Sequence, residues 1–173
     1  LSRYNSALQF VPISQITGTG DGNQFYSLFR DSKGFYWFGG TNGVIRFTHP
    51  AGNKHDAIWY RMGDKNHPLS HNRIRHIYED REQQLWIATD GSINRYDYNT
   101  HQFVHYNIVD GTGTYNTNWA YYLFEDTDGK LWIATCLGGI FVVDKHKLIQ
   151  SAGRSYVARS KIIPFIMGCR GCS

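Results

Sequence analysis

Several side chains in this sequence belong to types that perform chemistry, so their spacing is the first guide to function. Ser70 and His71 are adjacent, as a nucleophile and its base could be, but no nucleophile elbow surrounds Ser70. The eight histidines are scattered without metal-ligand spacing. His71 and His76 are five residues apart, and an odd spacing in a strand sends side chains to opposite faces. The sequence therefore predicts no catalytic residue, no metal site and no cofactor.

The cysteines and the net charge point to no further chemistry. Cys169 and Cys172 form a lone C-x-x-C pair, which we interpret as a chance pair because no second pair or histidine accompanies it. Cys136 is interpreted as a small residue in a turn. The net charge of +4 arises from four basic residues in 151–173, which leaves 14 basic and 14 acidic residues in 1–150. Because a phosphate-binding surface should be a patch on the folded repeats, the sequence predicts no direct nucleic-acid binding.

The same composition bears on membranes and export. No apolar run approaches the ~20 residues that a helix needs to span a bilayer, so we expect no membrane span in this chain. Residue 1 is Leu and no basic-then-apolar leader follows it. We therefore expect any export signal to have been removed or to lie outside this sequence.

Three aspartates could be read as acid–base carboxylates, but each belongs to a repeated pattern. Every one stands six residues before a tryptophan, and an alternating apolar segment precedes it. The pairs are Asp31 and Trp37, Asp80 and Trp86, and Asp126 and Trp132. An aspartate at a tight turn accepts backbone N–H groups two or three residues further on. The repetition therefore favours a structural role for all six residues, with the tryptophans in the core between neighbouring sheets.

Each copy of the pattern divides into short strands. In the middle copy, period-two alternation and turn residues predict strands at 74–79, 85–89, 93–98 and 102–106. The last strand of the first copy is predicted at 57–62. Four short antiparallel strands in every ~45–50 residues are typical of a β-propeller blade.

We therefore predict an all-β fold of about three four-stranded antiparallel blades, an incomplete propeller that is part of a seven-bladed one. Propellers close with at least about four blades, so three leave sheet faces open. The predicted divisions are 1–17 (the end of a preceding blade, with a strand at 8–13, and a linker), 18–62, 63–106 and 107–150 (three blades), and 151–173 (a tail without repeat features). For the tail we hypothesise a frameshift that truncates a longer protein near residue 159.

The segment from Leu69 to Tyr106 closely resembles the two-component-regulator propeller repeat. The matching features are the Leu-Ser-x-Asn-like start, the turn aspartate, the Leu-Trp-Ile-x-Thr strand, the Asp-Gly turn and the Arg-Tyr-Asp that ends the third strand. The resemblance covers about residues 18–150. It departs from the family pattern at Gln83, which replaces a turn glycine, and at Ala88 and Ala134, which replace a strand glycine.

This resemblance implies a function that the spacings alone do not. Such repeats form the periplasmic sensor half of hybrid two-component systems in gut Bacteroidetes, and many of these sensors detect oligosaccharides. The chain would then be a non-catalytic fragment of a ligand-sensing ectodomain. Its expected partners are an oligosaccharide ligand, the remaining blades and the histidine kinase of the full-length sensor, and a second copy in a homodimer. The kinase segment itself is not in this sequence.

A ligand site in a propeller is expected at the funnel around the central axis, where the first strand of each blade begins. The candidate ligand-binding residues are His71, Asn72 and Arg73 before one blade, and Tyr115, Asn118 and Trp119 before the next. Trp119 could stack on a sugar face, and Arg73 and Asn118 could supply polar contacts. Two alternatives stay open: a sialidase-like glycan-processing propeller enzyme, suggested by the Asp-box-like stretch from Asp31 to Trp37, and a structural protein-interaction propeller.

Overall fold

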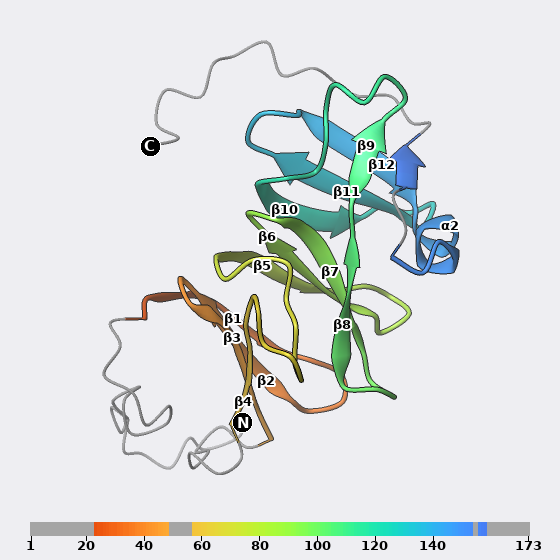
Figure 1. Cartoon of the computed structure of the whole chain (residues 1–173). Helices are drawn as coiled ribbons and strands as arrows, with labels where there is room; N and C mark the ends of the chain where they lie inside the picture. The colour runs from red at the N-terminus through yellow and green to blue at the C-terminus, as the bar shows by residue number, and fades with distance from the viewer. Residues whose placement is uncertain (1–22, 49–56, 154–155, 159–173) are drawn as a thin grey trace.

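The computed structural model describes residues 23–48, 57–153 and 156–158, which form a stack of small sheets (Figure 1). The strand predicted at 8–13 and the pair Cys169 and Cys172 lie outside the described residues. Cys136 is disulfide-bonded, so its predicted role as a simple small turn residue is incomplete. No helix within the described ranges is long and apolar enough to cross a membrane.

Three antiparallel sheets follow one another along the chain, each with its strands in sequence order. The first sheet contains β1 (Phe25–Arg30), β2 (Tyr36–Gly40), β3 (Gly43–Phe47) and β4 (Ile58–Tyr60). The second contains β5 (Ile74–Glu79), β6 (Leu85–Thr89), β7 (Ser92–Asp97) and β8 (Gln102–Tyr106). The third contains β10 (Ala120–Glu125), β11 (Lys130–Thr135) and β12 (Ile140–Asp144). The predicted all-β architecture of propeller blades is confirmed.

The third sheet differs from the expectation of four strands. After β12 the chain enters α2 (Lys145–Gln150), and the carboxylate of Asp144 caps this helix by accepting the Lys147 backbone N–H. The residues of α2 lack period-two alternation, and an aspartate N-cap favours a helix start. Beyond α2, the short strand β13 (Tyr156–Ala158) runs parallel to β9 (Ile108–Asp110), a pairing that the sequence pattern did not predict.

Apolar clusters fill the spaces between successive sheets. Between the first and second sheets lie Trp37, Val44, Tyr60, Ile77, Leu85, Ile87, Tyr96 and Phe103. Between the second and third lie Trp86, Ile93, Tyr106, Leu123, Leu131, Ile133, Phe141 and Val143. Trp37 and Trp86 are fully buried, whereas Trp132 is only partly buried. This difference follows from the stacking, because no described sheet covers the far face of the third one.

The same turn precedes the second strand of each sheet, and its aspartate holds the tryptophan. In each case Oδ1 accepts the backbone N–H groups of the residues two and four positions further on. Oδ2 accepts the indole N–H, at 2.8 Å for Trp37, 2.9 Å for Trp86 and 2.7 Å for Trp132. Gln83 adopts a φ of +62° where the other turns have glycine, a conformation that carries a small cost for a residue with a side chain.

Two polar contacts recur where one sheet meets the next. In the carboxylate contact, the glutamate just before a turn aspartate accepts a backbone N–H from the preceding sheet's turn. Glu79 accepts from Ser32 and Glu125 from Arg81, both at 2.9 Å. In the donor contact, the residue after the third strand reaches the preceding sheet's turn aspartate. Tyr98 donates to Asp31 at 2.8 Å, and Lys145 pairs with Asp80 at 3.2 Å.

The second interface contains a buried ion cluster. The Lys145 side chain is fully buried, and its Nζ lies 2.8 Å from Glu125 Oε1 as well as close to Asp80. Burial acts to lower the pKa of Lys145, but the adjacent Glu125 and Asp80 raise it above its ordinary value. The pKa of Glu125 is lowered even though burial acts to raise it, because the Arg81 backbone N–H and the Lys145 ammonium stabilise the carboxylate.

Replacing a buried tryptophan should cost more stability than replacing the partly covered one. We expect Trp86→Ala to lower the free energy of unfolding by about 4 kcal/mol, because it leaves a cavity between two sheets and removes the indole hydrogen bond. Trp132→Ala should cost at most about half as much, since no sheet among the described residues covers one side of its ring. Urea unfolding followed by circular dichroism measures both. Equal losses would contradict the stacking described above.

The ion cluster should make stability depend on pH in the acid range. Because the folded-state pKa of Glu125 lies below its unfolded value of about 4.3, its contribution is complete above that pH and is lost as the pH falls through the folded pKa. We expect Glu125→Gln to lower the free energy of unfolding at pH 7 by about 2 kcal/mol. Between pH 5 and 3 the variant should lose less stability than the wild type, as measured by urea unfolding at each pH. Parallel curves would contradict this role of Glu125.

Candidate functional site

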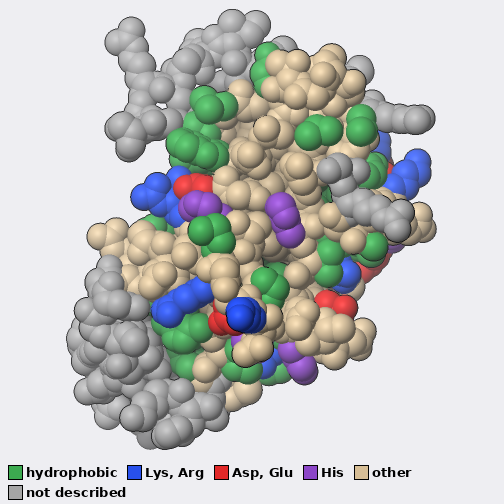
Figure 2. Space-filling view, viewed as in Figure 1, with side chains coloured by type: hydrophobic (Ala, Val, Ile, Leu, Met, Phe, Trp, Pro, Cys, Tyr) green, Lys and Arg blue, Asp and Glu red, His purple; other side chains and the backbone are tan. Residues whose placement is uncertain are grey.

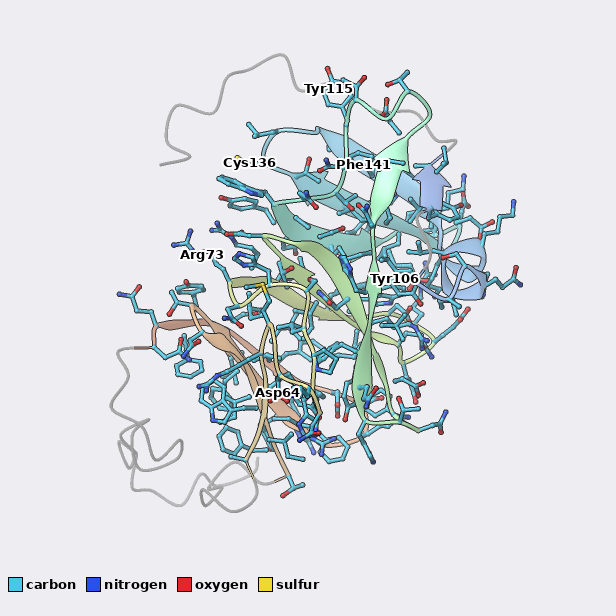
Figure 3. All side chains as sticks on the ribbon, in the orientation of Figure 1. Asp64, Arg73, Tyr106, Tyr115, Cys136 and Phe141 are labelled. Carbon is cyan, nitrogen blue, oxygen red and sulfur yellow. The ribbon has the colours of Figure 1, made fainter. Side chains whose placement is uncertain are left out.

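A pocket of about 370 Å³ opens in the third repeat, between the loop after β9 and the loop that joins β11 to β12. Its lining residues are Thr114, Tyr115, Asn116, Asn118, Trp119, Leu137 and Gly138. Figure 3 labels Tyr115 and Cys136, which lie toward the same end of the third sheet. This volume is at the small end of the range for ligand pockets.

Asp110 organises the loop that forms one wall. Its Oδ1 accepts the Tyr115 backbone N–H at 2.9 Å, and its Oδ2 accepts the Thr112 hydroxyl. The backbone N–H of Asp110 also donates to the Tyr115 carbonyl at 2.9 Å. The two bonds to the carboxylate lower the pKa of Asp110, and the bond from the Thr112 hydroxyl has a larger effect than the one from the Tyr115 amide. The pocket wall is therefore held in place by the loop's own hydrogen bonds.

Trp119 occupies a strained backbone position at the junction of two sheets. Its φ is +57°, a left-handed conformation that is costly for a bulky residue. Its backbone N–H donates to the Asp90 carbonyl of the second repeat, and its carbonyl accepts the Cys136 N–H, both at 3.0 Å. The side chain remains 40% exposed. The backbone is thus fixed between neighbouring sheets while the indole lies at the pocket.

The opposite wall exists because one hairpin is longer than its counterparts. Trp132 pairs with Val142, whereas Trp37 and Trp86 pair with Arg46 and Arg95, so the third hairpin contains one more residue. Leu137 at the tip is 74% exposed.

Gly138 allows this hairpin to approach the other wall. A Cβ there would lie 2.7 Å from the Asn116 carbonyl oxygen, so the glycine permits contact between the two loops.

The lining combines aromatic rings with uncharged hydrogen-bonding groups. Trp119 and Tyr115 offer flat apolar faces, and the two asparagines and Thr114 offer donors and acceptors. None of the seven lining residues is acidic or basic. Such a surface can stack on and hydrogen-bond to an uncharged ligand, but its side chains do not form a nucleophile–base pair or a metal-ligand set.

The structure divides the six predicted ligand-binding residues into two groups. Tyr115, Asn118 and Trp119 come together in the pocket, but His71, Asn72 and Arg73 do not line it.

The second group makes local contacts. Asn72 joins the first two repeats, because its Oδ1 accepts the Met62 N–H at 2.7 Å and its carbonyl accepts the Gly43 N–H at 2.6 Å. His71 Nδ1 accepts the Arg73 N–H at 3.1 Å, and the half-exposed Arg73 side chain lies 3.8 Å from Asp90.

Sequence reasoning missed four lining residues: Thr114, Asn116, Leu137 and Gly138. The first two are neighbours of predicted residues. Leu137 and Gly138 could have been found from the extra residue in the third hairpin, a departure from the repeat that is visible once the three copies are aligned. The physical link between the two loops, however, depends on their packing.

All three repeats match the model of one protein family. The family described as two component regulator propeller matches residues 19–42, 68–91 and 114–136, once in each repeat. The chain belongs to this family. No curated protein matches the chain.

The chain is also similar to extracellular domains whose structures have been solved. The chain is 83% identical, over 92% of its length, to the extracellular domain of BT4673 from B. thetaiotaomicron, described as a hybrid two component system, with a TM-score of 0.84. A second structure of BT4673, described as a one component system, gives 81% identity over 92% of the chain and a TM-score of 0.83. The chain spans about a fifth of these domains, covering 22% and 21% of their lengths.

A more distant structure shares the fold. The extracellular domain of BT3049 from B. thetaiotaomicron, also described as a hybrid two component system, is 24% identical over 81% of the chain and 19% of its own length. The TM-score is 0.62.

The positive φ of Trp119 should impose a backbone cost on any residue with a Cβ at this position. Both substitutions lose the indole contacts, but glycine tolerates a positive φ, whereas alanine keeps a backbone cost of about 1 kcal/mol. We therefore expect Trp119→Gly to be more stable than Trp119→Ala by about 1 kcal/mol, measured by urea unfolding. Equal stability of the two variants would contradict backbone strain at this residue.

Proposed function

We propose that the chain is part of the extracellular ligand-sensing domain of a hybrid two-component sensor and acts in the periplasm without catalysing a reaction. Family membership and the high identity to the BT4673 extracellular domain support this role. The remaining blades and a histidine kinase would be supplied by the rest of the full-length protein. The stretch from Asp31 to Trp37 supports a non-catalytic interpretation, because both carboxylate oxygens of Asp31 hold its own turn and tryptophan.

The ligand that we propose is an oligosaccharide, bound in the pocket at Trp119. The observation that carries this proposal is the combination of the 40% exposed indole with Tyr115 and two asparagine amides in one cavity. Sugars present an apolar face of C–H groups and a rim of hydroxyls, which match an aromatic platform with neutral hydrogen-bonding groups.

The pocket is also placed to transmit a signal. The Trp119 backbone is hydrogen-bonded to Asp90 of the second repeat and to Cys136 of the third. A ligand that moved the indole would therefore act on the junction between two stacked sheets, and a change in their packing could pass to the rest of the sensor.

Binding should depend on the indole. We expect Trp119→Ala to weaken binding of a neutral oligosaccharide at least about tenfold, which corresponds to about 1.4 kcal/mol of lost contact. Isothermal titration calorimetry of the purified chain with a panel of neutral and acidic oligosaccharides measures this. Tyr26→Ala is the matched control, because Tyr26 is a 53% exposed aromatic residue on the first sheet, outside the pocket.

The outcomes separate the candidate functions. Saturable binding that is lost in Trp119→Ala and kept in Tyr26→Ala supports the sensor. Hydrolysis of an oligosaccharide by the pure protein would favour the glycan-processing enzyme instead. Equal binding by wild type and Trp119→Ala would place the ligand elsewhere, and no binding across the panel would contradict an oligosaccharide ligand.

A further inference from the structure

Arg75 lies on β5, the strand of the second sheet that contacts β10 of the third sheet. The pairing of the first two strands skips one residue in each sheet, and these bulge residues are Tyr26, Arg75 and Tyr121. The extra residue of a bulge is left out of the regular ladder, and bulges commonly redirect a side chain. In the second sheet the redirected side chain is a cation.

The guanidinium group of Arg75 holds the Asp90 carboxylate with two hydrogen bonds. Nε donates to Oδ1 at 2.6 Å, and Nη2 donates to Oδ2 at 3.2 Å. The side chains are only 19% and 10% exposed, so the pair is largely shielded from water. Two parallel bonds between charged groups fix their mutual orientation.

Arg73 lies beside this pair but does not share its geometry. Its half-exposed side chain approaches Asp90 with Nη1 at 3.8 Å from Oδ2, which is beyond hydrogen-bonding distance. Figure 2 shows basic and acidic side chains together at the left edge of the molecule, at about the height at which Figure 3 labels Arg73. Arg73 is thus a neighbouring charge of the same sign that does not fix the carboxylate.

The guanidinium group of Arg75 also contacts the third sheet. Its central carbon lies 4.3 Å from the centroid of the Tyr121 ring, in a cation–π contact. The carbonyl of Asp90 accepts the Trp119 backbone N–H at 3.0 Å. Arg75 therefore restrains the chain on both sides of Ala120, directly at Tyr121 and through Asp90 at Trp119.

The backbone bond made by Trp119 departs from the repeat. The residue before the first strand is Gln24, Arg73 or Trp119 in the three sheets. The N–H groups of Gln24 and Arg73 donate to side chains of their own repeats, Thr41 and His71. Trp119 instead donates to the preceding sheet, and it alone of the three has a positive φ. In the described repeats, the strained residue occurs at the junction that contains the bidentate pair.

We propose that Arg75 is a positioning residue for the pocket, which holds the strained backbone of Trp119 in place and so preorganises the indole for a ligand. A strained backbone persists only where surrounding contacts determine it. A binding group that is already held in its bound conformation loses less freedom on binding. The proposal rests on the binding function proposed above, but its first test needs no ligand.

Removing the pair should release the Trp119 amide. We expect Arg75→Gln to raise the hydrogen-exchange rate of the Trp119 backbone N–H at least about tenfold, because its acceptor is no longer held, as measured by NMR. Asp90→Asn keeps the accepting carbonyl but removes the carboxylate charge, and it should also raise this rate. Arg73→Gln is the matched control, because it removes one positive charge beside Asp90 without breaking the two hydrogen bonds, and it should leave the rate unchanged.

The effect should be local. Further along the same two strands, the His76 ring stacks on Tyr122 with centroids 4.1 Å apart, which should keep β5 and β10 together in the variants. The internal reference is the Thr117 backbone N–H, which donates to the Ile108 carbonyl at 3.0 Å within the third repeat. Its exchange rate should be the same in all variants.

Affinity gives a second readout. The neutral oligosaccharides that bind the wild type in the calorimetric titration above should bind Arg75→Gln at least about fivefold more weakly and Arg73→Gln as tightly as the wild type. Arg73 does not line the pocket, so its removal takes no direct ligand contact away.

The outcomes are decisive in either direction. The proposal is overturned if Trp119 exchange in Arg75→Gln equals that of the wild type, if Arg73→Gln accelerates it equally, or if Thr117 exchange accelerates as much. Faster Trp119 exchange with unchanged oligosaccharide affinity in Arg75→Gln would also overturn it. If the wild type binds no oligosaccharide, the proposed function fails by itself, and the exchange rates still decide whether Arg75 holds Trp119.

Discussion

The structure depends on one carboxylate that is repeated in every sheet. The turn aspartate closes its own turn through one oxygen and holds the tryptophan indole through the other. In the two covered interfaces it also meets a donor from the next sheet, Tyr98 in one case and Lys145 in the other. Because the same group fixes the turn, the large aromatic ring and the neighbouring sheet, local structure and stacking are coupled in each repeat.

The two interfaces obey the same geometry but differ in charge. Tyr98 brings a neutral hydroxyl to Asp31, whereas Lys145 brings a buried ammonium to Asp80 and Glu125. Replacing one member of a buried ionic group is expensive, while a neutral hydrogen bond is less demanding. Stacking therefore tolerates different side chains at one repeat position, provided that a donor reaches the carboxylate.

The candidate site arises where the third repeat departs from the other two. Its hairpin is one residue longer, Gly138 allows close approach to Asn116, and Trp119 accepts a strained backbone. The regular part of each repeat packs closely against the neighbouring sheet, and the cavity lies where the third repeat departs from that regularity. The pocket is consistent with the general tendency of functional sites to carry local strain on a rigid framework.

The sequence by itself determined the repeat, the four strands of the second sheet and the identity of the turn residues, because alternation, turn chemistry and the Asp–Trp spacing are local properties. It also placed Tyr115, Asn118 and Trp119 among the candidate ligand contacts. Only the tertiary structure separated them from His71, Asn72 and Arg73, and replaced an expected strand by α2. It alone revealed Lys145 between two carboxylates and Leu137 opposite Tyr115, because such contacts join loops and sheets that are distant along the chain and have no local sequence signal.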